Sequence, residues 1–326
     1  MDAAVIVAET AQPTTIVQVQ NIDTDAVIST FLQQYDCKDS SRQLYGRTLR
    51  QFFAWVHRTG RQIQYLTRAD VLQYRDGLIS GEATEDGNPR SSLTAASYLT
   101  SLKIFYEWLE SEKVCPNITA GIRLPKRAKK FEREALTNEQ ARALVEQTAA
   151  TATLRDTAII NLLLRCGLRT IEVVRADIGD IRTKGGKTIL YVQGKGHTTK
   201  DNFVILSDKC CAALTAYLQT RKGAAATEPL FTCDSNNNKG GRMTTRTISS
   251  IAKQHLQGIG LDSRSYTAHS LRHTAACSLL EATNDIHAVQ MTLRHANPAT
   301  TQLYTYHIDE RRRLKAAAEL RLDSLF

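Results

Sequence analysis

The spacing of apolar residues predicts helices in the first third of the chain. Apolar positions recur every three or four residues, the period of an amphipathic helix, in four segments: residues 24–35, 42–60, 68–80 and 92–113. Aromatic residues follow this period in the second segment, at Phe52 and Trp55, and in the fourth, at Phe105 and Trp108. Such stripes are more often core than binding surface. We therefore expect an all-helical first domain.

The rest of the chain combines helical patterns with one short β region. Two apolar runs, KTILYVQ (187–193) and NFVILS (202–207), are typical of strands and are joined by GKGHTTKD. Helical patterns surround them: residues 138–149, 153–166, 208–221, 244–258, 269–282, 285–294 and 309–322. The predicted fold class is mainly α, with a small antiparallel sheet in a mostly helical second domain.

The best candidate for a domain boundary is LPKRAKKFEREALTNEQ (124–140), in which Thr137 begins a helix-start pattern. Pro125 precedes a run of four basic residues: Lys126, Arg127, Lys129 and Lys130. A basic linker is either simply solvated or lies along a phosphate backbone, and both interpretations stay open. The predicted organisation is a flexible tail, a first domain, a linker and a second domain: residues 1–22, 23–123, 124–136 and 137–326.

The charge is unevenly distributed along the 326 residues. The net charge is +9, but residues 1–123 carry 12 Lys and Arg against 14 Asp and Glu, and the remainder carries 30 against 19. A basic second domain indicates a polyanionic partner, with nucleic acid the first candidate. The alternative is a surface that is merely basic and solvated.

The cysteines and the hydropathy of the chain indicate the cellular compartment in which the protein works. The seven cysteines include no C-x-x-C pair, and their odd number indicates reduced thiols in a reducing compartment. The first 20 residues lack the pattern of a signal peptide, and no window approaches 18 uninterrupted apolar residues. We expect a cytoplasmic protein without a membrane span.

The segment TAHSLRHTAACSLL (267–280) carries three cationic or nearly cationic side chains within five residues: His269, Arg272 and His273. Two histidines four residues apart on a helix could bind zinc, but the zincin pattern H-E-x-x-H has a glutamate between them. No acidic residue stands there in this chain, and no third ligand is obvious nearby. We therefore expect no metal site.

A phosphate-binding interpretation fits these residues better. Another arginine, Arg169, follows Gly167 in LLLRCGLRTIEV (162–173). Arginine suits bidentate recognition of phosphate oxygens, so Arg169 and Arg272 could hold both non-bridging oxygens of one phosphodiester. Downstream, LRHANPATTQLYTY (293–306) supplies His295 and Tyr304, and the hairpin supplies Lys195 between two glycines.

This ordered set, Arg, Lys, His, Arg, His and Tyr, resembles that of the tyrosine recombinase (phage integrase) family, which includes the Xer-type chromosome-dimer resolvases. GLRTIEV looks like the family's first arginine box, and HSLRHTAA looks like its H-x-x-R-H box. LRHANPATTQLYTY resembles the family's box that runs from a histidine to the tyrosine. The first domain is similar to the family's four-helix core-binding (SAM-like) domain. The resemblance covers nearly the whole chain and implies a site-specific DNA recombinase that integrates, excises or resolves DNA.

The resemblance implies a covalent mechanism. Tyr304 would attack the scissile phosphate and form a 3′-phosphotyrosyl link with a free 5′-hydroxyl. A phenol has a pKa near ~10, so it needs a base, for which His269 is the candidate. Lys195 would protonate the departing 5′-oxygen. No metal, cofactor or ATP is expected.

The remaining residues of the set would stabilise the reacting phosphate. Arg169, Arg272 and His295 would offset the charge that gathers on its oxygens. Glu172 resembles the acidic residue that orients the first arginine, and His273 would support the site by hydrogen bonding nearby.

The chain departs from the family pattern at three places. Arg294 stands where relatives commonly have the glycine of L-G-H, so either a tight helix end is altered or the arginine reaches DNA. In the hairpin, Asn202 stands near the position where relatives often have another basic residue, which weakens the assignment of Lys195 a little. Tyr306 lies two residues after Tyr304, but Tyr304 has the family's spacing from His295. We therefore favour Tyr304 as the nucleophile.

The expected partners are double-stranded DNA sites and other copies of the chain. Base contacts would come from a helix of each domain. On 244–257 we expect Arg246 and Lys253 to lie on exposed faces, and they are the candidates for DNA binding. The tail 309–326 follows an amphipathic pattern. In the family this segment docks on a neighbouring subunit to build a ring of four on two duplexes, whereas intramolecular packing is the alternative.

Other functions compete with this interpretation. A catalytically silent DNA-binding relative would usually lack the tyrosine or an arginine, and a metal-dependent nuclease would use His269 and His273. A topoisomerase of type IB would apply the same chemistry to one strand. The departures from the commonest Xer pattern favour a mobile-element integrase over a resolvase.

Overall fold

The structure is a computed structural model that describes residues 23–125, 134–194 and 197–295. It also describes nine later residues: 297, 298, 301, 302, 304, 305, 308, 313 and 320. The contacts between Cα atoms divide the chain into two compact units, Met1–Lys130 (unit 1) and Phe131–Phe326 (unit 2). The expected tail 1–22 and the run of four basic residues after Pro125 lie outside the described residues.

The division falls inside the predicted linker 124–136. The last residues of that segment, however, pack on unit 2. Ala135 and Leu136 are buried, and the backbone N–H of Leu136 donates to the Thr274 hydroxyl at 2.8 Å. Unit 2 therefore begins a few residues before the helix-start pattern at Thr137.

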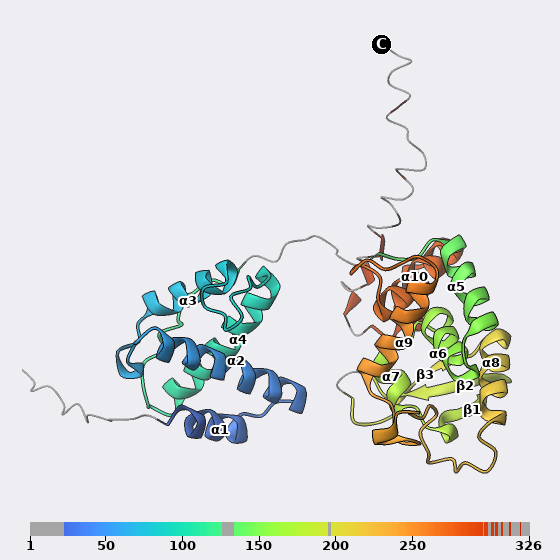
Figure 1. The fold of residues 1–326 in the computed structure, drawn as a ribbon, viewed down its shortest axis with the longest axis horizontal. Helices are drawn as coiled ribbons and strands as arrows, with labels where there is room; N and C mark the ends of the chain where they lie inside the picture. Colours follow the sequence, from blue (N-terminus) through green and yellow to red (C-terminus); the bar gives the residue numbers. More distant parts are fainter. Residues whose placement is uncertain are drawn as a thin grey trace, which may run out of the picture. The chain divides into compact units, whose positions relative to one another are not determined.

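Unit 1 contains the four predicted helices, shown in blue to teal in Figure 1: α1 (Thr24–Gln34), α2 (Asp39–Arg58), α3 (Arg68–Ser80) and α4 (Ser92–Ser111). Side chains fix where helices begin, because they satisfy backbone N–H groups that have no partner within the helix. Asp23 accepts from Ala26 N at 3.0 Å, and Ser91 accepts from Thr94 N at 3.2 Å. A short 3-10 helix, η1 (Ile63–Tyr65), precedes α3.

The core of unit 1 is aromatic, as the helical stripes predict. Phe52, Trp55 and Phe105 are all buried. Phe105 meets Phe31 edge to face with ring centroids 5.3 Å apart, and Phe52 meets Tyr74 at 5.0 Å. Such pairs contribute about 1 kcal/mol each beyond the burial of their area.

Unit 2 is mostly helical, with one three-stranded antiparallel sheet in the order β1-β2-β3. Its strands are β1 (Ile181–Lys184), β2 (Lys187–Val192) and β3 (Asn202–Ile205). The predicted fold class is confirmed, but the apolar pattern does not predict β1 or the short α7. The helices are as follows: α5 (Asn138–Thr151), α6 (Leu154–Arg165), α7 (Thr170–Arg175), α8 (Asp208–Gln219), α9 (Thr245–Gly258), α10 (Ala268–Thr283), α11 (Ile286–Leu293), and the 3-10 helices η2 (Ile178–Asp180) and η3 (Asn236–Asn238).

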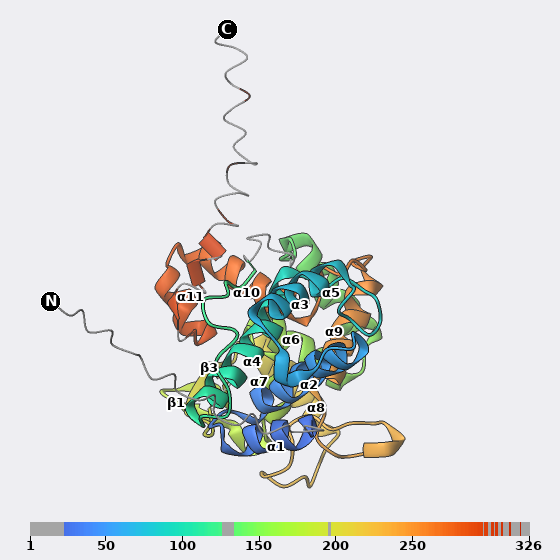
Figure 2. The same cartoon turned by 90° about the vertical axis from the view of Figure 1, so that its left-hand side faces the viewer.

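Helix α6 forms the centre of unit 2. Its run Ala158–Leu163 is buried, and the helix packs against α5, α8 and α10. Figure 2 shows α10 and α11, which also contact each other, at one side of unit 2. After α6 the chain turns at Gly167, whose carbonyl accepts a hydrogen bond from Arg272 on α10. Among the described residues, no helix is both long and apolar enough to cross a membrane.

Candidate active site

Arg169 is positioned by the turn that follows α6. Gly167 has a φ of 57°, a conformation that favours glycine, and a Cβ there would lie 2.7 Å from Leu293 Cδ2. Beyond this turn Arg169 caps α7. Its backbone N–H donates to Glu172 Oε2 at 2.7 Å, and its Nη1 donates to Glu172 Oε1 at 2.9 Å. One carboxylate therefore fixes both the backbone and the guanidinium of Arg169.

Arg272 lies on α10 and is only 1% exposed. Its Nη1 donates to the Gly167 carbonyl, and its Nη2 donates to the Leu293 carbonyl at 2.6 Å. Nη1 also lies 3.8 Å from Glu172 Oε2. Burial lowers the pKa of Arg272 to about 9, with a further lowering by Arg169 and an opposing effect of Glu172. Arg272 stays charged at neutral pH, and the structure brings it together with Arg169.

Glu172 is fully buried and binds three guanidinium groups. Besides Arg169 and Arg272, Arg294 donates from Nη2 to Glu172 Oε2 at 2.8 Å. Burial by itself would raise the pKa of Glu172, but Arg294, the Arg169 N–H and the other two arginines together hold it below its usual value. The carboxylate is therefore ionised. The contact of Arg294 cannot be predicted from sequence spacing, because 122 residues separate the partners.

Tyr304 is buried between two histidines. Its ring centroid lies 5.0 Å from that of His273 and 5.9 Å from that of His295. Burial raises the pKa of the Tyr304 phenol, although the Arg272 and Arg169 charges oppose this rise. The phenol is thus protonated at neutral pH without DNA, so any nucleophilic role requires a base.

His295 is neutral at pH 7 in this structure. Burial, followed by the charges of Arg272, Arg169 and Arg294, lowers its pKa to about 4. Its Nδ1 pairs with the Thr301 hydroxyl at 2.9 Å, a partner for which the sequence gives no signal beyond the T-T that precedes the tyrosine. The imidazole is therefore available as a neutral hydrogen-bonding group.

The two histidines of α10 occupy different environments. His269 is exposed in the first turn, where its backbone N–H donates to the Thr267 hydroxyl at 3.2 Å. His273, one turn later, is buried, and its Nδ1 faces Cys277 Sγ at 3.9 Å. In the described ranges, no group of three or more His, Cys, Asp or Glu side chains is arranged to hold a metal ion.

Several predicted residues lie outside the described part of the chain. These are Lys195, the alternative tyrosine Tyr306 and most of the tail 309–326. In the described part of the same hairpin, Lys200 Nζ donates to the carboxylates of Asp177 and Asp180, each at 2.5 Å. Lys200 thus ties the end of the hairpin to the segment that follows α7.

The two candidates on α9 differ in exposure. Arg246 is exposed, as expected. Lys253 is half-buried instead, and its Nζ donates to the carbonyls of Asp262 and Ser263 at 2.7 and 2.8 Å. The reason is the turn that follows α9, which folds back over the lysine. Its ammonium therefore holds this turn in the present structure.

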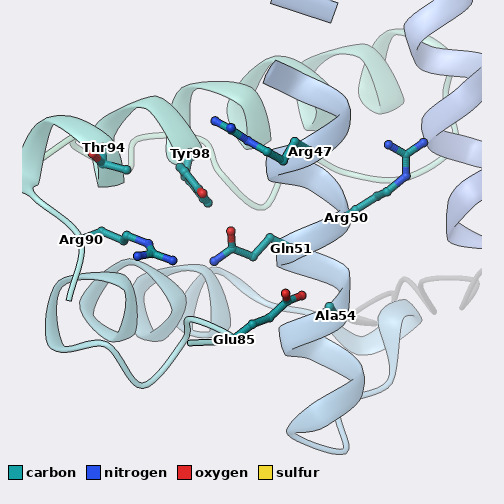
Figure 3. A pocket seen from close by; sticks show the side chains of 8 residues that line it. All are labelled: Arg47, Arg50, Gln51, Ala54, Glu85, Arg90, Thr94 and Tyr98. Carbon is teal, nitrogen blue, oxygen red and sulfur yellow. The ribbon is translucent and has the colours of Figure 1, made fainter. Parts of the chain in front are cut away.

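Unit 1 has a basic cavity of about 820 Å³ between α2 and α4 (Figure 3). Arg47 extends from α2 toward Tyr98 on α4, while Arg90 and Gln51 point toward each other. Arg50 extends the other way and donates to Asp25 on α1 at 2.9 Å. The remaining lining residues are Ala54, Glu85 and Thr94. No local sequence pattern predicts this cavity, because its arginines come from segments about 40 residues apart.

The chain is similar in sequence to proteins of one known family. A profile of the phage integrase family matches residues 134–311, more than half of the chain. Tyrosine recombinase XerC of Caldanaerobacter subterraneus subsp. tengcongensis is 33% identical over 66% of this chain, which spans only 59% of that relative's length. Tyrosine recombinase XerC of Pelobacter propionicus is 33% identical over 80% of this chain and 83% of its own.

The fold is also shared with a solved structure. The XerH site-specific recombinase, bound to palindromic difH substrate in a post-cleavage complex, superposes with a TM-score of 0.68 at 20% identity. This likeness covers 85% of the present chain and 79% of XerH. By its family profile and its XerC relatives, this chain belongs to the phage integrase family, the tyrosine recombinases.

Proposed function

We propose that this tyrosine recombinase cuts and rejoins DNA at specific sites, with Tyr304 as the nucleophile. The observation that carries the proposal is the surroundings of Tyr304. Its ring is buried between His273 and His295, and the charges of Arg272 and Arg169 act on its phenol. A phenol beside two arginines is suited to attack a phosphodiester, because the arginines bind the anion that the phenol must approach.

Cleavage exchanges one ester bond for another. The Tyr304 oxygen forms a bond to phosphorus while the bond from phosphorus to the 5′-oxygen breaks, which leaves a 3′-phosphotyrosyl link. His269, exposed at the start of α10, accepts the phenol proton, and Lys195 gives a proton to the 5′-oxygen. Rejoining is the reverse, with a 5′-hydroxyl attacking the phosphotyrosine. The covalent link conserves the bond energy, so no ATP is required.

The arginines take the electrostatic role that a metal ion has in other phosphoryl-transfer enzymes. Arg272 is held by the carbonyls of Gly167 and Leu293, and Arg169 is held by Glu172. Because both are fixed before substrate binds, little reorganisation accompanies the reaction. Neutral His295 donates a hydrogen bond to a phosphate oxygen. We accordingly propose a reaction without metal or cofactor.

Both units contribute to DNA binding in this proposal. The cavity between α2 and α4 offers Arg47 and Arg90 to the duplex, in a unit whose sequence is otherwise slightly acidic. Arg246 contributes from α9 of unit 2. The basic residues of the linker, Lys126, Arg127, Lys129 and Lys130, and the side chain of Lys253 remain candidates for phosphate contacts. A protein engaged in this way would be associated with the nucleoid.

Four copies of the chain would act together. Exchange between two duplexes requires four strand cleavages, and each chain supplies one Tyr304. We propose a tetramer on two duplexes, in which the segment 309–326 docks on a neighbouring copy. We also propose integration of a mobile element rather than dimer resolution, on the departures from the Xer pattern at Arg294 and near Asn202.

Covalent capture of DNA tests this function. The substrate would carry the junctions that flank the gene, with a nick placed so that cleavage releases a short strand and traps the intermediate. With EDTA present, wild type should form a protein–DNA adduct on a denaturing gel. Tyr304→Phe should abolish the adduct, and Tyr306→Phe should retain it.

Other outcomes identify the competing functions. Tight, salt-sensitive binding without an adduct would indicate a catalytically silent relative. Cleavage that disappears with EDTA would indicate a metal-dependent nuclease. Relaxation of plasmids without recombined products would indicate a topoisomerase.

A further inference from the structure

Arg294 occupies a backbone position that does not suit arginine. It ends α11 with φ 54° and ψ 49°, in the left-handed region. In the described part of the chain only two other residues besides glycines have positive φ, Lys113 and Asn284. A side chain with a Cβ is strained there, and glycine or asparagine would be accommodated more easily. The tight end of α11 is therefore kept although its last residue is an arginine. An interaction of the arginine side chain must offset the backbone strain.

The side chain of Arg294 is directed into the active site. It is 7% exposed, and its Nη2 donates to Glu172 Oε2 at 2.8 Å. Its Nη1 donates to the Thr292 carbonyl at 2.6 Å, whereas its buried Nε has no hydrogen-bond partner among the described residues. The hydrogen-bonding capacity of Arg294 is thus not fully used by the fold.

The charges around Glu172 do not balance without substrate. Arg169, Arg272 and Arg294 bring three positive charges to a single carboxylate, which leaves a formal excess of two. A bound phosphodiester has one negative charge, and the five-coordinate phosphorus formed during attack has two. The cluster therefore matches the charge of the transition state better than that of the bound substrate, which is the requirement for catalysis.

We propose that Arg294 is a positioning residue for strand cleavage, which holds Glu172 between the two phosphate-binding arginines and adds the third positive charge that offsets the doubly charged transition state. The proposal rests on the function proposed above. It predicts a larger effect on the rate of cleavage than on the affinity for DNA, because Arg294 acts on charge that develops only during attack.

The test measures single-turnover adduct formation with saturating nicked DNA. Arg294→Gln removes the charge and should slow adduct formation about 10- to 100-fold, with less than about a threefold change in Kd. Arg294→Lys keeps a charge at the same backbone position and should recover most of the rate. Lys113→Gln is the matched control, since it removes an exposed charge from another left-handed position in unit 1, and it should leave the rate unchanged.

A neutral substrate separates the electrostatic role from a structural one. With a methylphosphonate at the scissile position, one charged oxygen is replaced by a methyl group. The loss caused by Arg294→Gln should then shrink to less than about threefold, because less charge develops. An equal loss on both substrates, or an equal loss in Arg294→Lys and Arg294→Gln on ordinary DNA, would overturn the proposal, as would a wild-type rate in Arg294→Gln.

The variants also show whether a lost rate reflects misfolding. Arg294→Gly removes the charge and also the strain at φ 54°, which offsets part of the lost ion pair, so its Tm should lie above that of Arg294→Gln while its cleavage is equally slow. A slow rate explained by a lowered Tm in every variant would contradict the proposed role. Failure of the recombinase function itself is distinguishable, because wild type would then form no adduct at all.

Discussion

The imidazole ring of His295 is stacked on the phenol ring of Tyr304, with centroids 5.9 Å apart and planes inclined by 19°. Both rings are buried beside Arg272, and this environment shifts the pKa values of the two groups in opposite directions. Burial and the nearby cations lower the pKa of His295 to about 4, whereas burial raises that of Tyr304. Both groups are therefore uncharged at neutral pH before DNA binds.

The neutral state of His295 makes the stability of unit 2 depend on pH. The unfolded chain protonates this histidine near pH ~6.5 and the folded chain only near pH 4. Between these values the unfolded state binds more protons, so stability falls as the pH is lowered. We expect His295 to account for a loss of about 2 kcal/mol between pH 7 and pH 5.

Urea unfolding of wild type and His295→Gln at the two pH values measures this contribution. The variant should lose about 2 kcal/mol less than wild type on acidification, since glutamine does not titrate. Equal losses in both proteins would show that His295 does not have a lowered pKa.

Gly167 is expected to tolerate no side chain. Its φ is 57°, a Cβ would lie 2.7 Å from buried Leu293, and its carbonyl accepts a hydrogen bond from Arg272. Gly167→Ala should destabilise unit 2 by about 2–4 kcal/mol and slow adduct formation. Gly185→Ala is the matched control, because Gly185 has φ 56° with nothing within 4 Å of the added Cβ. Thermal or urea unfolding should show a cost of only about 1 kcal/mol there, and equal costs would refute the steric argument.

Glu172 is expected to be essential for the arrangement of the arginines. Glu172→Gln leaves three guanidinium groups around a neutral amide in a fully buried site. Loss of one partner from a buried ion pair costs about 3–5 kcal/mol, and we expect a loss of this size together with failure to form the adduct. Glu146→Gln, at an exposed position of α5, serves as the control in the same urea titration. A change below about 1 kcal/mol in Glu172→Gln would contradict the charge balance described above.

The cavity of unit 1 is expected to contact DNA phosphates. Arg47→Ala and Arg90→Ala should each weaken binding and reduce the slope of log K against log salt by about 1. Arg75→Ala removes an arginine that pairs with Asp76 on α3, outside the cavity, and should leave the slope unchanged. Fluorescence anisotropy over a range of salt concentrations makes the comparison. If the slope of log K against log salt were the same in all three variants, unit 1 would contact DNA at a place other than this cavity.

Local sequence patterns predict most of the helices because these helices bury one face each. The expected segment 68–80 is α3 (Arg68–Ser80), and 244–258 is α9 (Thr245–Gly258) within one residue. The pattern of apolar residues does not predict strand β1, because its sequence IRTK contains a single apolar residue. The signal that could reveal it is the Gly185-Gly186 pair, a two-residue hairpin turn that joins β1 to β2.

The residue types of the active site are predictable from sequence, but their mutual contacts are not. The ordered boxes identify Arg169, Arg272 and Tyr304, since each lies in a short motif. The contact of Arg294 with Glu172 and that of His295 with Thr301 depend on how α11 packs against α7 and α10. The local spacing of residues holds no information on such packing. For this reason the sequence identifies Arg294 only as a departure from the family pattern.

Strand cleavage by Tyr304 is tested most directly by identifying the residue that carries DNA. The trapped adduct would be digested with nuclease and trypsin, and the modified peptide sequenced by mass spectrometry. Cleavage after Arg294 and Arg311 yields one peptide that contains both Tyr304 and Tyr306, and fragment ions on either side of Thr305 distinguish them. We expect a nucleotide joined through its 3′-phosphate to Tyr304. A nucleotide on Tyr306, or on any other residue, would contradict this expectation.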